Sequence, residues 1–219
     1  MRRYDYCYSQ AIKKCALIVL LCVSQVAVSA QNTEQSLPKY CTTSCVSTYG
    51  AILGISLPDT KAYSNCRPEC VVYDPNIHEG TYTGIKWQCV EFARRWLLQH
   101  KGAVYGDVDI AADIWTKIDQ LTDVATNEKI PLNSYVNGST QPPKIGDLLI
   151  YAKAFYGTGH VAVITGMDHE NGLIKVGEQN YSNTPWLNDY ARTIKYIKSD
   201  GRYWVLDGYI LGWKQIQSM

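Results

Sequence analysis

The chain has 219 residues, of which 46% are hydrophobic and 19% charged, an ordinary composition for a globular protein with one full domain. Lys and Arg total 21 against 20 for Asp and Glu, so the basic excess that marks a nucleic-acid binder is missing. No phosphate-binding loop of the form G-x-x-x-x-G-K occurs. We therefore expect neither a nucleic-acid partner nor a P-loop nucleotide site.

The first 30 residues have the features of a secretory signal. Four basic residues precede an apolar run at 16–23, and small residues occupy 28–30, where a signal peptidase would cleave. We expect cleavage after Ala30 and a secreted or lumenal protein with no stable membrane span. The alternative is an uncleaved membrane anchor, although Ser24 and Gln25 interrupt a run that would need about 20 apolar residues to cross a bilayer.

Three of the eight cysteines fall within the predicted signal. The other five form two Cys-x3-Cys pairs and one isolated residue: Cys41 with Cys45, Cys66 with Cys70, and Cys89. In a secreted protein this pattern predicts two disulfides and one free thiol. The spacing does not determine the pairing, but we favour bridges that join the two pairs and tie the N-terminal arm to residues 65–71. A four-thiolate zinc site is the alternative.

The segment before residue 80 shows little periodicity. A polar leader with the first cysteine pair is expected at 31–48, and the domain proper at 49–219. The apolar, glycine-punctuated stretch 49–57 predicts a turn into a strand that ends at Pro58. Residues 62–79 contain two prolines and two cysteines and predict mostly loop.

Two helices are predicted next. The segment 90–100 (VEFARRWLLQH) carries an apolar stripe at helical spacing, and Gly102 is a typical stop after it. The segment 110–121 (IAADIWTKIDQL) also repeats apolar residues on one helical face. Both helices precede the segments with strand character.

Strands dominate the chain after residue 130. The clearest are 147–151 (DLLIY), 160–165 (HVAVIT), 173–177 (LIKVG), 191–197 and 203–213, which are short, apolar and rich in β-branched residues. Helices followed by an antiparallel run of strands predict an α+β domain.

Cys89 directly precedes the helix predicted over 90–100. The free N–H groups and positive potential of a helix N-terminus stabilise a thiolate, so this isolated cysteine is a candidate nucleophile. A buried, inert cysteine is the alternative.

His160 opens a predicted strand, where a single histidine is commonly a structural residue. A hairpin centred near residue 169 or 170 places Glu178 or Asn180 roughly opposite it. Because strand side chains alternate between faces, all three lie on one face of the hairpin. One imidazole nitrogen can then contact a carboxylate or amide and the other Cys89, as covalent catalysis requires.

Four segments carry a family resemblance: TGIKWQCVEFARRWL, GTGHVAVIT, VGEQN and ILGW. Together they resemble the amidase domain of glutathionylspermidine synthetase/amidase and are similar to that of trypanothione synthetase/amidase. These proteins belong to the CHAP group of papain-like cysteine amidohydrolases and peptidases. The resemblance runs from about Tyr49 to Trp213. It implies a papain-like fold in which N-terminal helices pack on an antiparallel, partly barrelled sheet.

The resemblance also implies roles for particular residues. Cys89 becomes the nucleophile, His160 the general base and Glu178 the carboxylate that orients it. The positions implied to contact the scissile carbonyl or the substrate are Gln88, Arg94, Asn180 and the loop Val108, Asp109, Ile110 and Ala111. In contrast, we expect Glu91, Arg95 and Asp109 to be solvated or paired surface charges, and Trp87 to lie in the core.

The implied function is that of a secreted thiol amidase that needs no metal or organic cofactor. The relatives carry a ligase domain after the amidase region, and we expect hydrolysis without amide synthesis here. The substrate would be a peptide-like amide: a glutathionylspermidine-like conjugate or a peptidoglycan peptide, some of which are cut at D-alanyl-glycyl bonds. The alternatives are a non-catalytic peptide- or wall-binding module of the same fold, and a zinc-stapled interaction protein.

Overall fold

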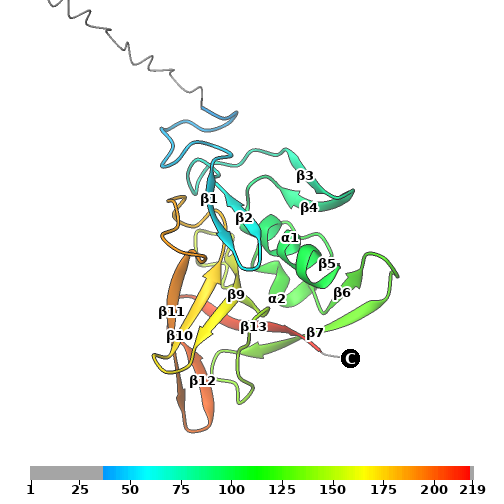
Figure 1. Ribbon diagram of the computed structural model, residues 1–219, viewed down its shortest axis with the longest axis vertical. Coiled ribbons are helices and arrows are strands. Elements are labelled where there is room, and N and C mark those ends of the chain that lie inside the picture. The colour runs from blue at the N-terminus through cyan, green and yellow to red at the C-terminus, as the bar shows by residue number, and fades with distance from the viewer. Residues whose placement is uncertain (1–36, 218–219) are drawn as a thin grey trace, which may run out of the picture. The chain divides into compact units, whose positions relative to one another are not determined.

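The structure is a computed structural model that describes residues 37–217. The predicted signal at 1–30 lies outside the described residues, as does the leader up to residue 36. The described residues belong to one compact unit, built mainly of antiparallel strands (Figure 1).

A nine-stranded sheet forms the centre of the fold. Its strand order is β12-β11-β10-β9-β8-β13-β7-β6-β5, and every neighbouring pair is antiparallel. The C-terminal strand β13 lies between β8 and β7, so it joins the two halves of the sheet. The strands are β5 Ala103–Tyr105, β6 Gln120–Asp123, β7 Lys129–Val136, β8 Leu148–Tyr151, β9 His160–Asp168, β10 Leu173–Gly177, β11 Arg192–Ser199, β12 Arg202–Val205 and β13 Ile210–Ile216.

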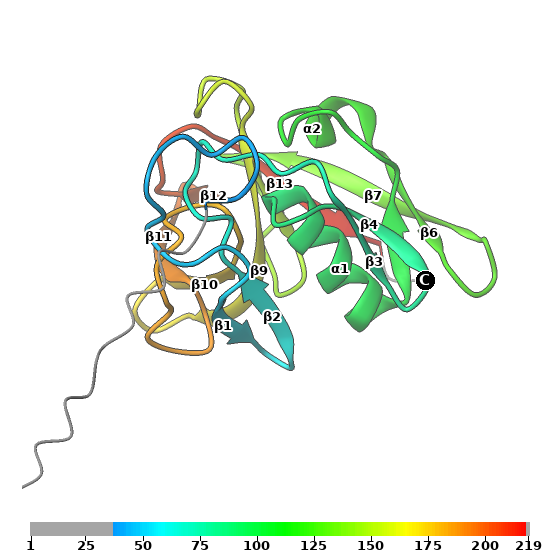
Figure 2. The ribbon, with the colours of Figure 1, turned by 90° about the horizontal axis from the view of Figure 1, so that it is seen from above.

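Two hairpins and two helices complete the described chain. The hairpins pair β1 (Ile52–Ser56) with β2 (Thr60–Tyr63), and β3 (Pro75–His78) with β4 (Thr81–Ile85). The helices are α1 (Cys89–Lys101) and the short α2 (Asp113–Lys117). The view of Figure 2 shows α1 alongside the sheet, where it contacts β9, β4 and β5.

The helix α1 is fixed by its apolar face and by its C-terminal cap. Phe92, Trp96 and Leu97 are buried at helical spacing, and burial of each such side chain contributes roughly 1.5–3 kcal/mol. Gly102 then adopts a left-handed conformation (φ 62°), and its N–H donates to the carbonyl of Leu98 at 3.0 Å. A glycine at this position ends the helix without strain.

Alternate residues of β8 and β9 pack into two apolar clusters, because successive strand side chains point to opposite faces. The cluster that contains the α1 side chains includes Leu148, Ile150, Val161 and Val163. The other cluster includes Leu149, Tyr151, Ala162, Ile164 and Trp213. The two clusters hold β9, and with it the position of His160, from both sides.

The α+β class fits the structure, but two finer features of the predicted fold are not confirmed. Four strands precede α1 in the described residues, so the helices do not come first. The sheet begins at β12 and ends at β5, so it is open rather than closed into a barrel.

The helix predicted over 110–121 is wrong for most of its length. Only Asp113–Lys117 is helical, and Ile118 is already extended (φ −112°, ψ 112°). Residues Gln120–Asp123 form β6, whose backbone pairs with both β5 and β7. The hydrogen bonds of the sheet therefore override a helical apolar pattern, with Ile114 and Leu121 still buried.

The predicted strands fit the structure with local exceptions. The segment 173–177 coincides with β10, and 147–151 and 160–165 fall on β8 and β9. The strand predicted at 203–213 is two strands, β12 and β13, separated by a turn. The predicted loop 62–79 contains the end of β2 and the whole of β3.

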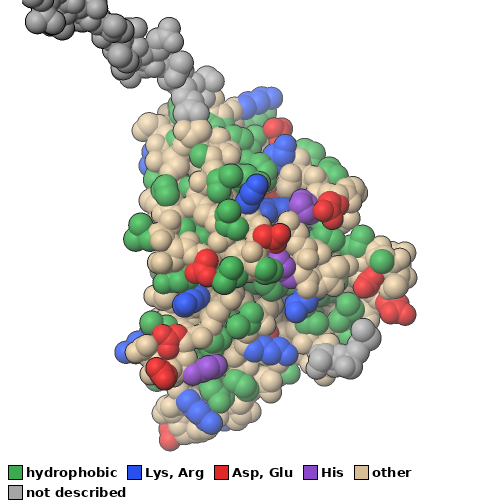
Figure 3. Space-filling view, in the orientation of Figure 1, with side chains coloured by type: hydrophobic (Ala, Val, Ile, Leu, Met, Phe, Trp, Pro, Cys, Tyr) green, Lys and Arg blue, Asp and Glu red, His purple; other side chains and the backbone are tan. Residues whose placement is uncertain are grey.

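The surface shows no concentration of one charge on the visible face. Lys and Arg side chains are interspersed with Asp and Glu there (Figure 3). Within residues 37–217, no helix is long and apolar enough to cross a lipid bilayer.

Candidate active site

Cys89 is the first residue of α1 and the free cysteine of the described chain. Gln88 before it is extended (φ −83°, ψ 160°), so the helix starts at the cysteine itself. The thiol is buried and accepts hydrogen bonds from the backbone N–H groups of Val90 and Val161. These donors favour a negative charge on the sulfur.

His160 is placed at the start of β9 by the glycine before it. Gly159 has φ +73°, and a Cβ there would lie 2.6 Å from the carbonyl oxygen of Tyr151 and 2.9 Å from the backbone nitrogen of Ala112. Only a glycine lets the chain pass this close. The imidazole that follows is buried, and its Cα pairs with that of Tyr151 in β8.

Glu178 directly follows β10 and reaches His160 across the hairpin. Nε2 of His160 donates to Oε2 of Glu178 at 2.9 Å, and both side chains are buried. The other imidazole nitrogen is left for Cys89, and the His160 and Cys89 side chains are also hydrogen-bonded. The structure therefore brings together the three residues that the sequence singled out.

The electrostatics of the three groups favour a charged pair. Burial alone would raise the pKa of the Cys89 thiol, but the nearby His160 and the backbone N–H donors lower it below its ordinary value. Burial alone would lower the pKa of His160, but Cys89 and Glu178 raise it to about 9. The pKa of Glu178, which burial would raise, is held below its usual range by His160 and Arg192. This arrangement can hold a thiolate beside an imidazolium, and a thiolate is a reactive nucleophile at neutral pH.

Arg192 lies behind Glu178 and was not foreseen from the sequence. Its Nε donates to Oε1 of Glu178 at 2.7 Å, and its other nitrogens contact Asp207 and the hydroxyl of Tyr151. The register offered a signal: Arg192 of β11 pairs with Val176 of β10, so it shares a face with Glu178, two residues further on.

Gln88 and Asn180 form a polar group next to Cys89. Nδ2 of Asn180 donates to Oε1 of Gln88 at 2.9 Å, so the two predicted substrate-contacting amides touch each other. Nε2 of Gln88 lies 3.4 Å from the carbonyl oxygen of Cys70. The buried Asn65 amide donates to the same carbonyl and, at 3.2 Å, to Oδ1 of Asn180. Asn65 and Cys70 are further site neighbours that the sequence did not reveal.

A cavity of about 160 Å³ opens on the Glu178 side of this group. Its walls include Glu178, Asn180, Tyr181, Trp186 and Arg192. Polar and aromatic groups therefore surround a space large enough for part of a small ligand.

The comparisons with known proteins agree with this geometry. Residues 80–180 match the CHAP domain family model, and this range contains Cys89, His160 and Glu178. The chain therefore carries a CHAP domain at 80–180. It is 35% identical over 190 residues to the bifunctional glutathionylspermidine synthetase/amidase of Escherichia coli (strain K12), covering 78% of this chain and 30% of that protein. It is 34% identical over 160 residues to trypanothione synthetase of Crithidia fasciculata, covering 73% of this chain and 24% of that protein.

The chain thus spans about a quarter to a third of the length of these relatives. The CHAP domain match and the similarity to a named amidase support a cysteine amidohydrolase.

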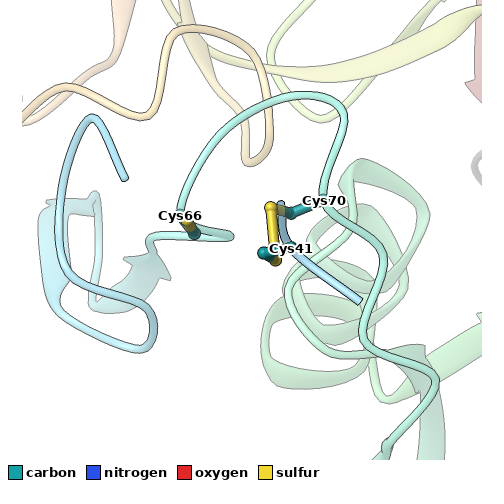
Figure 4. Close-up of side chains that lie close together, drawn as sticks. All are labelled: Cys41, Cys66 and Cys70. Atoms are coloured by element: carbon teal, nitrogen blue, oxygen red, sulfur yellow. A yellow bond between two sulfur atoms is a disulfide. The ribbon is translucent and has the colours of Figure 1, made fainter. Parts of the chain in front are cut away.

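The two disulfides lie just outside the CHAP match. Cys41 bonds to Cys70 and Cys45 to Cys66, so the bridges join the two Cys-x3-Cys pairs as favoured from the sequence. Figure 4 shows the Cys41–Cys70 bridge with Cys66 close by. Because the sulfurs bond to each other, they are not available as the four thiolates of the alternative zinc site. The bridges tie the N-terminal arm to the loop that carries the Cys70 carbonyl.

Arg94 connects α1 of the CHAP domain to the predicted substrate loop. It is buried between the rings of Tyr82 and Tyr105, and its Nη1 contacts Asp107 at 3.1 Å. The loop Val108, Asp109, Ile110 and Ala111 follows Asp107. The chain after this loop lies beside the approach to His160, since the Ala112 N–H donates to the Thr158 carbonyl at 3.0 Å.

The expected surface location of Glu91 and Arg95 is wrong, whereas Asp109 is exposed. Glu91 is fully buried and pairs with Arg95 at 2.7 Å, and it also accepts hydrogen bonds from Asn76, Thr83 and Gln179. A buried carboxylate needs such a set of donors. Trp87, expected in the core, is half-buried and stacks on Tyr63.

Proposed function

We propose that this CHAP protein is a secreted thiol amidase in which Cys89 is the nucleophile, His160 the general acid and base, and Glu178 the carboxylate that orients the imidazole. The observation that carries the proposal is a free cysteine at a helix N-terminus, hydrogen-bonded to a buried histidine that is itself bonded to a buried glutamate. These are the parts of covalent amide hydrolysis.

The reaction begins with attack of the Cys89 thiolate on an amide carbonyl. Negative charge then develops on the carbonyl oxygen, and protonated His160 donates its proton to the leaving amine nitrogen. The products are a free amine and a thioester on Cys89. A water molecule, deprotonated by His160, attacks the thioester carbonyl; the C–S bond breaks, the acyl group leaves as a carboxylic acid, and the Cys89 thiolate and protonated His160 are regenerated.

Two groups are placed to stabilise the oxyanion. The backbone N–H of Cys89 is in the first turn of α1, where N–H groups lack partners within the helix. The side chain of Gln88 directly precedes it and is only weakly bonded to the Cys70 carbonyl. Each such donor contributes about 3–4 kcal/mol to transition-state stabilisation in comparable enzymes.

The substrate is a peptide-like amide with a glycine on one side of the cleaved bond. One relative is named as an amidase for glutathionylspermidine. Peptidoglycan peptides with a D-alanyl-glycyl bond also carry a glycine at the cleaved amide, but there the glycine supplies the amine rather than the carbonyl. Asn180 and the Val108–Ala111 loop border the site and would contact the substrate, with Arg94 binding it from α1.

The protein acts outside the cytosol. Two disulfides are typical of secreted proteins, because cytosolic thiols are kept reduced. The sequence of residues 1–30 has the pattern of a secretory signal.

The proposal is tested by incubating the purified protein with glutathionylspermidine and, separately, with peptidoglycan, and by reading the products by mass spectrometry. Release of spermidine or of a peptide with a new terminus supports the proposal and identifies the substrate class. The matched control is Cys89→Ala, which must release neither product. A wild-type protein that binds either material without cleaving it would support the binding module instead.

A further inference from the structure

We propose that Arg192 is a positioning residue for the hydrolysis proposed above, because its guanidinium holds the Glu178 carboxylate ionised and aimed at His160. The inference rests on the proposed function and adds a fourth residue to the Cys89–His160–Glu178 chain. Arg192 lies outside the residues that match the CHAP family model.

Each oxygen of Glu178 has a different short contact, and Nη2 of Arg192 also lies 3.5 Å from Oε2. Oε2 accepts from Nε2 of His160 at 2.9 Å, whereas Oε1 accepts from Nε of Arg192 at 2.7 Å. The carboxylate is therefore held from both ends. It cannot rotate away from the imidazole without losing its hydrogen bond to Arg192.

The guanidinium is itself fixed by three other groups. Its Nη1 donates to Asp207 at 2.8 Å and its Nη2 to the Tyr151 hydroxyl at 2.7 Å. The same hydroxyl donates to Asp207 at 2.7 Å, which closes the network. The ring of Tyr181 lies against the guanidinium at 4.2 Å. A planar guanidinium with this many contacts has one orientation.

The sheet brings these groups together through its register. Tyr151 of β8 is the Cα partner of His160 in β9, and Arg192 of β11 is the partner of Val176 in β10. The four strands β8 to β11 are consecutive neighbours in the sheet. The positions of Tyr151 and Arg192 are thus set by the same backbone pairing that sets His160 and Glu178.

Arg192 also stabilises the charge of the buried Glu178 carboxylate. Glu178 is only 3% exposed, and a buried carboxylate takes up a proton unless donors and cations surround it. Burial raises the pKa of Glu178, and the hydrogen bonds and charges of His160 and Arg192 reverse that effect. If a neutral side chain replaced Arg192, only His160 would remain to keep the Glu178 carboxylate charged.

The sign of a pH effect depends on every charged or titratable group that faces this carboxylate. These groups are His160 on β9, Arg192 on β11, Tyr151 on β8 and Tyr181 after β10. One contact further away, Cys89 on α1 bonds to His160, and Asp207 after β12 bonds to Arg192. Among these groups the cations are Arg192 and protonated His160. Its loss leaves Glu178 near Asp207 without compensation, so Glu178 becomes protonated at a higher pH.

Protonation of Glu178 removes the negative charge that stabilises the imidazolium of His160, so the pKa of His160 falls. With less positive charge on His160, the pKa of Cys89 rises. In Arg192→Gln, the pH at which Cys89 becomes a thiolate therefore rises. Asp207→Asn has the opposite expectation: Arg192 loses a competing anion, so the thiolate forms at the same or a lower pH. A purely structural role for the network would move both variants in one direction.

The test is the pH dependence of Cys89 alkylation by iodoacetamide in the folded full-length protein, read by intact mass. In Arg192→Gln, we expect the acid limb to move upward by about one pH unit, so the rate at a fixed pH on that limb falls about tenfold. Arg192→Lys, which keeps the charge, should restore most of the rate. Arg202→Gln, at the exposed first residue of β12, is the matched control and should behave as wild type.

Thermal unfolding of each variant must show a folded protein under the assay conditions, and Tyr151→Phe supplies a milder second variant with a shift of the same sign. An unchanged acid limb in Arg192→Gln, or equal upward shifts in Arg192→Gln and Asp207→Asn, would overturn the inference. Alkylation does not need a substrate, so this result is independent of whether either amide is hydrolysed. Failure of the proposed function would instead appear as wild-type protein that releases no product.

Discussion

Glu178 lies on the same face of the β9–β10 hairpin as His160 because of a β-bulge. Near the turn, Leu173 pairs with Asp168, but after a register shift between Lys175 and Val176, Gly177 pairs with Val163. Without this shift of one residue, Glu178 would point to the opposite face of the sheet. The bulge therefore permits the 2.9 Å contact between the two side chains.

Replacement of Glu178 by Gln should lower kcat/KM by about 100- to 10,000-fold, because a neutral amide of the same shape cannot stabilise the imidazolium. The measurement is steady-state hydrolysis of whichever amide the wild type cleaves. The exposed Glu170→Gln, in the turn of the same hairpin, is the control and should leave kcat/KM unchanged. A Glu178→Gln variant with wild-type kcat/KM would remove Glu178 from the mechanism.

The pH profile of kcat/KM should be bell-shaped. Activity rises as Cys89 loses its proton, at a pH below that of an ordinary thiol because its pKa is lowered. It falls again as His160 loses its proton, since the raised pKa of about 9 keeps the imidazolium until that pH. The profile is measured from about pH 4 to about pH 10. A maximum only above the pKa of a free thiol would contradict the charged pair.

Loss of the Cys41–Cys70 bridge should affect both stability and activity. The double variant Cys41→Ser/Cys70→Ser should lose about 2–4 kcal/mol of unfolding free energy, measured by chemical denaturation. It should also lose kcat/KM, because the Cys70 carbonyl bonds to Gln88 and Asn65 beside the nucleophile. Cys45→Ser/Cys66→Ser is the comparison, with a similar loss of stability and a smaller loss of kcat/KM. Equal effects on kcat/KM would mean that the Cys70 carbonyl does not position the site.

Replacement of the buried Glu91 by Gln should lower the free energy of unfolding by about 3–5 kcal/mol, because it leaves the Arg95 charge buried without its partner. Chemical denaturation gives this value. The exposed pair of Lys117 and Asp113 provides the control, and Lys117→Gln should leave the midpoint unchanged. A similar midpoint for both variants would mean that the buried Glu91–Arg95 pair contributes little to stability.

The parts of the site that could be predicted are those with local signals. The start of α1 follows from apolar periodicity and a glycine stop, and it places Cys89 at a helix N-terminus. The strand 160–165 and the hairpin parity place His160 and Glu178 on one face. The helix start needs only a short stretch of chain. The shared face of His160 and Glu178 was predicted correctly, but it depends on the bulge after Lys175, which the sequence did not reveal.

The parts that could not be predicted depend on pairing over long distances. Arg192 is 41 residues from Tyr151, and Asn65 is 115 residues from Asn180, with no local pattern that joins them. The helix expected over 110–121 failed for the same reason, since the pairing of β6 with β5 and β7 decided its conformation. Glu91 and Arg95 looked like surface charges because their partners Thr83 and Gln179 come from other elements.

The most direct test of the account is alkylation of the native protein with iodoacetamide at about pH 6, where an ordinary thiol is almost wholly protonated. We predict one carbamidomethyl group, located on Cys89 by peptide mapping, and loss of hydrolysis in proportion to labelling; Cys89→Ala should take up none. Unlabelled Cys89 at this pH, or fully labelled protein that still hydrolyses its substrate, would contradict a Cys89 thiolate as the nucleophile.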